Sequence, residues 1–131
     1  MTDILRPLIV VFLVFHGLSH IFWFLAAWRP SKVGVVDGPW ILPGDVTLTS
    51  VVGRILGIVA LVVVVLLLVA AFALLIGEPW WRGAARYGVI LSFLVVLPWW
   101  PRMPRRIGLQ AIIADIVLMF AIALPLSVDI I

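Results

Sequence analysis

Four long runs of apolar residues, separated by short breaks rich in arginine, proline and glycine, dominate the pattern of this chain. The runs cover about residues 8–28, 51–76, 82–100 and 107–128. A bilayer core about 30 Å thick is crossed by roughly 20 residues of α-helix, which rises about 1.5 Å per residue. The pattern therefore predicts four transmembrane helices.

The third run is the shortest, and its flanking tryptophans support it as a span. Its uncharged part, 87–100, is short for a membrane helix. Trp80–Trp81 and Trp99–Trp100 bracket it, and tryptophan favours the two interfaces of a bilayer. Because 82–100 would extend over about 27 Å of helix, we predict a span there with a tryptophan pair at each interface. The same interpretation applies to two more tryptophans at the ends of runs, Trp28 and Trp40.

The connections between the runs are short, except for a longer first loop at about residues 30–50. Short connections make consecutive helices antiparallel neighbours. We therefore predict an all-α fold, a four-helix transmembrane bundle in antiparallel up-down order that forms a single domain over 1–131. Four residues before the second run offer an N-cap for its helix: Asp45, Thr47, Thr49 and Ser50.

The first run also resembles a secretory signal peptide, because Leu25-Ala26-Ala27 is similar to a cleavage site. The apolar core of a signal peptide is typically about 7–15 residues long, which is shorter than 8–28. We therefore expect this run to be retained as the first span.

Composition leads to the same class of protein. The chain is 66% hydrophobic and only 11% charged, whereas a soluble domain carries roughly 25% charged residues. Its mean hydropathy is +1.34. These values exclude a water-soluble domain and a disordered chain. The absence of cysteine excludes disulfides, thiolate metal sites and thiol redox catalysis.

The net charge of +3 comes from basic residues that stand mostly at the ends of the apolar runs. We interpret them as anchors at the lipid headgroups, and we expect no nucleic-acid partner. More of them flank the first and third loops than the opposite side, which predicts cytoplasmic loops and both termini outside, in a bacterial inner membrane. The first group is Arg29, Lys32, Arg54, Arg102, Arg105 and Arg106, and the second is Arg6, Arg82 and Arg86.

Few polar side chains lie within the runs, and these are functional candidates because polar groups are costly inside a membrane. His16 and His20 are four residues apart and share one helix face. Counting residues places His20 and Asp115 at one depth, about 12 Å from the side of the first and third loops. We predict that these two face each other and share a hydrogen bond, directly or through one water. Three further candidates lie near this group: Ser92 at the midplane, Arg54 one turn inside the second helix and Trp23 one turn beyond His20.

Three chemical interpretations compete with a purely structural one. His16, His20 and Asp115 could ligate a divalent metal. One histidine could ligate haem or chlorin, whereas two on one helix face cannot take both axial positions of one haem. The group could also form a proton relay or a ligand pocket, which a cavity shared by His16 and Trp23 would favour. In the structural alternative, its hydrogen bonds only fix helix packing. The sequence requires no cofactor, and none is identified.

Gly53 and Gly57 are four residues apart near the start of the second run. Small residues at this spacing let helices approach closely in lipid. We expect them to mark a tight helix contact.

Several short motifs resemble small bacterial four-helix membrane proteins. They are His16-Gly-Leu-Ser-His20 with Ala26-Ala27-Trp28, then Gly77-Glu-Pro-Trp-Trp-Arg82, and then Trp100-Pro101 and Arg106-Ile-Gly-Leu109. The overall plan is also similar to the DoxX-like group of four-helix membrane proteins, some of which are linked to quinone-coupled redox complexes. The resemblance implies a fold and a location, and it carries over no functional residues.

Two hypotheses of different classes follow. In the first, the protein is a non-catalytic accessory or assembly subunit of a larger membrane complex, whose partners are the lipid bilayer and other membrane subunits or a second copy of itself. In the second, His16, His20 and Asp115 build a membrane-embedded ligand, haem, metal or proton-relay site with redox-linked or carrier activity.

Overall fold

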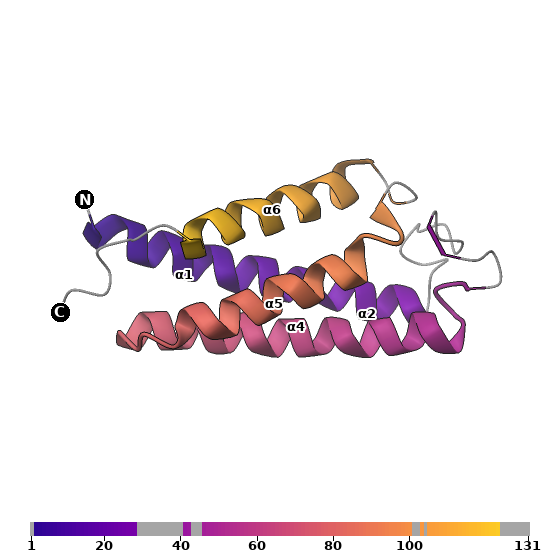
Figure 1. Cartoon of the computed structure of the whole chain (residues 1–131), viewed down its shortest axis with the longest axis horizontal. Helices are drawn as coiled ribbons and strands as arrows, with labels where there is room; N and C mark the ends of the chain where they lie inside the picture. The colour runs from indigo at the N-terminus through magenta and orange to yellow at the C-terminus, as the bar shows by residue number, and fades with distance from the viewer. Residues whose placement is uncertain (1, 29–40, 43–45, 101–102, 104, 124–131) are drawn as a thin grey trace.

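A computed structural model describes residues 2–28, 41–42, 46–100, 103 and 105–123. All regular secondary structure in this part of the chain is helical, which confirms the prediction of an all-α fold. Figure 1 shows these helices side by side along the length of the molecule. They are α1 (Thr2–Ser19), α2 (Ile21–Trp28), α4 (Val51–Ile76), α5 (Trp81–Val96) and α6 (Arg105–Ala123).

Three helical stretches are long and apolar enough to cross a membrane: Ile4–Trp28, Val51–Ile76 and Arg106–Ala123. Large apolar side chains are exposed over the surface, with Phe15 72% and Phe120 68% accessible. Both features are consistent with an integral membrane protein. At 16 residues, α5 is about 24 Å long and is shorter than these three stretches.

The first apolar run does not form one continuous helix. The amide of His20 donates to the carbonyl of Gly17 at 3.1 Å, three residues back, and the helix breaks between α1 and α2. Two side chains use the carbonyl of His16 instead. The hydroxyl of Ser19 donates to it at 2.6 Å, and Nδ1 of His20 contacts it at 2.9 Å. This break follows from side chains that compete with the backbone for its hydrogen bonds, a feature that apolar periodicity does not reveal.

Helix α4 has the same bounds as the second apolar run, and both of its ends are capped. Ser50 is its N-cap and accepts a hydrogen bond from the amide of Gly53 at 3.3 Å. Gly77 ends it with φ 85°, in the left-handed region that favours glycine. Arg6 of α1 donates from Nε and Nη2 to the last carbonyls, those of Leu74 and Leu75, at 2.8 and 2.9 Å. The start of α1 therefore lies beside the end of α4.

Helix α5 ends at Val96, short of the predicted 82–100, because Pro98 cannot continue a helix. The tryptophans at its two ends differ from the prediction. Trp81 and Trp99 are 1% and 0% exposed and belong to the two apolar cores. Trp80 and Trp28 are exposed at helix ends, whereas Trp40 lies outside the described residues. Helix α6 begins at Arg105 and is described to Ala123, so the end of the predicted 107–128 also lies outside.

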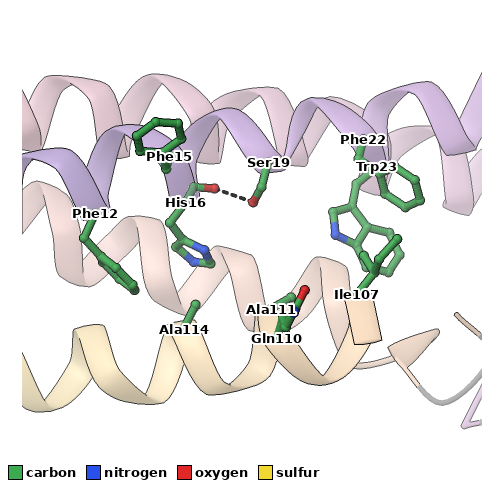
Figure 2. A pocket seen from close by; sticks show the side chains of 10 residues that line it. All are labelled: Phe12, Phe15, His16, Ser19, Phe22, Trp23, Ile107, Gln110, Ala111 and Ala114. Carbon is green, nitrogen blue, oxygen red and sulfur yellow. Dashed lines mark hydrogen bonds between the residues drawn. The ribbon is translucent and has the colours of Figure 1, made fainter. Parts of the chain in front are cut away.

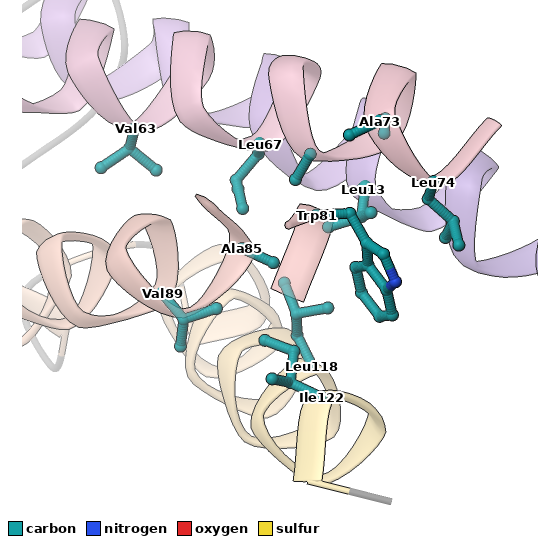
Figure 3. Packing of buried hydrophobic residues seen from close by; sticks show 12 residues of the cluster. Leu13, Val63, Leu67, Ala73, Leu74, Trp81, Ala85, Val89, Leu118 and Ile122 are labelled. Carbon is teal, nitrogen blue, oxygen red and sulfur yellow. The ribbon is translucent and has the colours of Figure 1, made fainter. Parts of the chain in front are cut away.

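Helix α4 packs against α1, α2 and α5, whereas α6 packs chiefly on α5. In the core shown in Figure 3, Leu67 of α4 lies opposite α5. It is fully buried between two glycines. A Cβ on Gly17 would lie 3.1 Å from Cβ of Leu67, and a Cβ on Gly88 would lie 2.7 Å from its Cδ2. Three helices are therefore held close together around one leucine side chain.

The two glycines predicted to mark a helix contact lie in different surroundings. A Cβ on Gly57 would lie 2.7 Å from Cβ of Ala27 and 2.9 Å from the ring of Trp28, so α4 and α2 meet there. Gly53 instead lies against the carbonyls of Thr47 and Leu48, in the turn that precedes α4. Only Gly57 contacts a second helix in this way, because the chain folds back over the first turn of α4 at Gly53.

Candidate functional site

Four buried polar side chains form one hydrogen-bonded chain across three helical segments. Oδ1 of Asp115 in α6 lies 2.7 Å from Nε2 of His16 in α1. Its Oδ2 lies 2.7 Å from the hydroxyl oxygen of Ser92 in α5, within hydrogen-bond distance. The oxygen of Ser92 lies 2.7 Å from Nε2 of His20, in the break between α1 and α2. We call His16, Asp115, Ser92 and His20 the polar cluster.

The predicted direct pair of His20 and Asp115 is wrong. Asp115 binds His16 and Ser92, and His20 reaches it only through the Ser92 hydroxyl. The two histidines are one helical turn apart, so the residue count misjudged depth by about 6 Å. The count assumed helices that start in one plane and stand parallel, whereas α6 is set at a slant to α4 in Figure 1.

Burial makes these hydrogen bonds necessary. His16 and His20 are 6% and 1% exposed, and Ser92 and Asp115 are inaccessible. An unpaired aspartate at membrane depth would cost about 2.5–3.5 kcal/mol even on the most lenient scale. Both oxygens of Asp115 have partners, so the cluster removes this cost and joins α6 to α1 and α5.

Hydrogen-bond chemistry determines part of the protonation of both rings. A carbonyl oxygen only accepts, so Nδ1 of His20 carries a hydrogen and donates it to the carbonyl of His16. When Asp115 is ionised it also only accepts, so Nε2 of His16 donates to it. A neutral His16 ring then presents Nδ1 as a hydrogen-bond acceptor. An aspartate that orients a histidine in this way is a familiar arrangement for positioning a base.

The ring of His16 is also held by its neighbours on the helix. It stacks on Phe12 with ring centroids 5.8 Å apart, and His20 contacts it edge-on at 5.0 Å. The adjacent Gly17 allows Leu67 of α4 to approach the backbone of α1 at this point. Gly88, one turn before Ser92, does the same for α5. These two glycines let α1 and α5 pack against the same leucine of α4.

A pocket of about 280 Å³ opens between α1–α2 and α6, next to the polar cluster. Figure 2 shows His16 and Trp23 pointing across it toward α6, near Ala114 and Ile107. The lining is mainly aromatic and apolar, with three polar residues. The lining residues are Phe12, Phe15, His16, Ser19, Phe22, Trp23, Ile107, Gln110, Ala111 and Ala114.

Within the described ranges, no group of three or more His, Cys, Asp or Glu side chains is placed to hold a metal ion. Nε2 of His16, both oxygens of Asp115 and Nε2 of His20 are engaged with one another or with Ser92. Arg54 is exposed in the first turn of α4 and does not join the cluster.

The sequence did not identify several residues of the site. Phe12 and Phe22 look like ordinary membrane-helix residues, and Gln110 and Ala111 carry no motif. Phe12 lies four residues before His16 and Ala111 four residues before Asp115, a spacing that places each on the same helix face as that polar residue. These two faces form one site only if α1 and α6 are neighbours. Ser92 and Trp23 were both predicted, and the structure places them in the cluster and in the pocket wall.

The chain matches no known protein-family model, no curated protein and no solved structure. The geometry of the site is therefore the basis on which a function can be proposed.

Proposed function

We propose that this protein binds a small apolar molecule that carries a hydrogen-bond donor, such as a hydroxyl group, in the pocket between α1–α2 and α6. One observation carries the proposal. Asp115 orients His16, and His16 forms part of the wall of a pocket of about 280 Å³. A mainly apolar cavity with a few convergent polar groups is the usual form of a small-molecule site.

The polar end of the ligand would bind at His16. With Nε2 engaged by Asp115, Nδ1 is the ring nitrogen that remains for a ligand hydroxyl. Ser19 and Gln110 add further hydrogen-bonding groups at the wall. A donor that binds a prepositioned acceptor in an apolar pocket gains both affinity and orientation.

The apolar body of the ligand would lie against the aromatic side chains Phe12, Phe22 and Trp23. Phe15 and Ile107 also line the pocket and are 72% and 40% exposed on the outer surface. If these helices lie in a bilayer, that surface faces acyl chains. The ligand would therefore enter sideways from lipid and would not need an aqueous path.

This proposal includes an architecture for the membrane. The three long helical stretches and the shorter α5 would cross it as a four-helix bundle in up-down order. Following the charge bias, the first and third loops would be cytoplasmic and both termini outside. Reporter tags on the two termini should be labelled from the same face of sealed vesicles. Labelling from opposite faces would contradict this topology and would leave the pocket proposal to its own test.

The accessory-subunit hypothesis stays a prediction. Exposed apolar side chains cover the helices, but contact with lipid requires them as much as contact with a partner subunit does. The polar cluster and its pocket are the more specific features, and they favour the ligand-binding function.

Binding of 2-naphthol to the purified protein in detergent tests the proposal. The hydroxyl compound should bind several-fold to about tenfold more tightly than 2-methoxynaphthalene, in which a methyl group replaces the donor hydrogen, since a hydrogen bond contributes about 0.5–1.5 kcal/mol. Ala111→Phe, which fills the pocket, should abolish this binding. Ala123→Phe, a matched change at an exposed position of α6, should not. Equal affinity for both compounds, or an unaffected Ala111→Phe variant, would overturn the proposal.

A further inference from the structure

Two members of the polar cluster, Ser92 and His20, do not line the pocket, and ligand binding alone does not explain them. They extend the hydrogen bonds of Asp115 away from the ligand side. Ser92 is inaccessible and His20 is 1% exposed, so neither side chain exchanges protons readily with solvent water. A structural role would need only one partner for each oxygen of Asp115. The second histidine beyond Ser92 therefore calls for another explanation.

The number of protons that the polar cluster holds provides an explanation for His20 and Ser92. The bonds that link His20 to Ser92, Ser92 to Asp115 and Asp115 to His16 are each 2.7 Å long, and each holds one proton. Because the Ser92 hydroxyl has a single hydrogen, it donates to only one neighbour at a time. With His16 donating from Nε2, two arrangements of the same protons remain.

In the charged arrangement, Nε2 of His20 donates to Ser92 and Ser92 donates to an ionised Asp115. His20 is then an imidazolium, since its Nδ1 already carries a hydrogen. In the neutral arrangement, Asp115 is protonated on Oδ2 and donates to Ser92, and Ser92 donates to Nε2 of a neutral His20. The two differ by a shift of two protons through the Ser92 hydroxyl, with no change in total charge.

We propose that the polar cluster is a general base for an acidic hydroxyl compound of the phenol class. In this proposal His16 accepts the proton, and proton shifts among Asp115, Ser92 and His20 place a carboxylate beside the protonated His16. This inference rests on the pocket proposed above. At rest the neutral arrangement holds, because a His20 imidazolium and an Asp115 carboxylate held apart by Ser92 are costly inside a membrane while no further cation lies beside the carboxylate. The cluster then exposes an uncharged His16 to the ligand.

Proton transfer from the ligand moves three protons and conserves total charge. The bound hydroxyl gives its proton to Nδ1 of His16, which leaves a phenolate and an imidazolium. The proton on Oδ2 of Asp115 passes to Ser92, and the hydroxyl proton of Ser92 passes to Nε2 of His20. Asp115 becomes a carboxylate beside the His16 imidazolium, and His20 carries the other positive charge. Total charge is conserved, and each new charge has an opposite charge within one or two hydrogen bonds.

The helices packed around the polar cluster add no further titratable side chain to its hydrogen bonds among the described residues. From α1 and the break after it come His16 and His20, from α5 comes Ser92, and from α6 comes Asp115. Helix α4 contributes the apolar Leu67 at Gly17 and Gly88. Arg54 is exposed in the first turn of α4. Among the described residues, the titratable groups joined by these hydrogen bonds are therefore His16, His20 and Asp115.

The test uses the full-length protein in detergent with 2-naphthol, whose naphtholate absorbs at longer wavelength than the neutral compound. In the wild type, binding should produce naphtholate at a pH where free 2-naphthol stays neutral. The infrared band of a protonated carboxyl, assigned through Asp115→Asn, should disappear on binding. The ¹⁵N signals of His20 should change from a neutral ring to an imidazolium.

Ser92→Ala interrupts the path of hydrogen bonds from Asp115 through Ser92 to His20 and tests the role of that path. The naphtholate fraction, measured per molecule of bound probe, should fall roughly tenfold, because a hydrogen bond to a charged group is lost. Ser92→Thr, which keeps the hydroxyl, should restore it. Thermal unfolding of each variant reports whether the fold is retained, and Ala123→Phe should behave as wild type.

The outcomes separate the two proposals. If the wild type does not bind 2-naphthol, the binding function itself fails. If it binds 2-naphthol but only in neutral form, the pocket stands and the general base is refuted. The general base is also refuted if naphtholate forms without any change in the Asp115 and His20 signals, or forms equally in Ser92→Ala.

Discussion

The α1–α2 segment has two unlike neighbours. Toward α4 it is packed without polar contact at Gly17 and Gly57, where added Cβ atoms would lie about 3 Å or less from side chains of α4 or α2. Toward α6 it is joined by the hydrogen bond of His16 to Asp115, and a pocket of about 280 Å³ remains beside that bond. Apart from the hydrogen bonds of Arg6 at the end of α4, the α4 side is a close apolar fit, whereas the α6 side is a polar bridge with open space.

This difference shows that one helical segment can use close packing toward one neighbour and hydrogen bonds toward another. Close packing through small residues supplies much of the attraction between helices in lipid. The polar bridge links α6 to α1 directly beside the pocket. Substitutions on the α4 side and on the α6 side can test whether each side loses the stability that its contacts predict.

The largest effect is expected at the polar bridge. Asp115→Leu leaves the buried Nε2 of His16 without its partner, while Ser92 still bonds to His20, and it should destabilise the protein by about 3 kcal/mol. The double change His16→Leu and Asp115→Leu should cost less than Asp115→Leu alone, because it removes the unpaired ring and keeps the bond of Ser92 to His20. Chemical unfolding in detergent measures both. Losses that simply add would show that the cluster is not coupled.

The next largest effect is expected at the tight apolar side. Gly57→Leu places a side chain where even a Cβ would lie 2.7 Å from Ala27, so α2 should move away from α4. Overpacking of this kind costs about 1–3 kcal/mol. Gly83→Leu is the matched control, because no atom lies within 4 Å of a Cβ there. Equal stability of the two variants would mean that Gly57 does not mark a tight contact.

Substitutions at Leu67 and Gly88 should partly compensate each other in unfolding free energy, because Leu67 lies between Gly17 and Gly88. Gly88→Ala should destabilise by about 1–2 kcal/mol, since its Cβ meets the side chain of Leu67, which is held from the other side by Gly17. Leu67→Ala removes the atoms that clash. The double variant should therefore lose less than the sum of the single changes in a double-mutant cycle. A sum of independent losses would place the strain elsewhere.

The smallest effect is expected at the capped end of α4. Arg6→Met removes two hydrogen bonds to the final carbonyls and should cost about 1 kcal/mol in unfolding free energy. Arg54→Met removes an exposed cation at the opposite end of the same helix, where a positive charge is not favoured. It should be neutral or slightly stabilising. The reverse order would contradict the capping role of Arg6.

Much of the helical plan could be predicted from apolar run length, and α4 agrees in both bounds. The break at His20 could not, because it depends on the side chains of Ser19 and His20 bonding to one carbonyl. The burial of Trp99 was also missed. Pro98 ends α5 early, and the chain then turns the ring of Trp99 into the core. The prediction had placed this ring at the bilayer interface.

For the site, residue type was the useful signal and depth was not. Polar residues in apolar runs identified all four members of the cluster. Their pairing depends on where each helix starts and how α6 is tilted, and a shift of one turn exchanges His20 for His16 as the partner of Asp115. The pocket depends on α1 and α6 meeting across it, which no pattern within either helix encodes.

A crystal structure with bound 6-bromo-2-naphthol tests the central claim most directly, because anomalous scattering locates the bromine. We predict one strong bromine peak in the pocket near Phe12 or Trp23, with the naphthol oxygen within about 2.6–3.2 Å of Nδ1 of His16. Bromine found only on the outer helix surfaces, or a naphthol oxygen bound away from His16, would contradict the account.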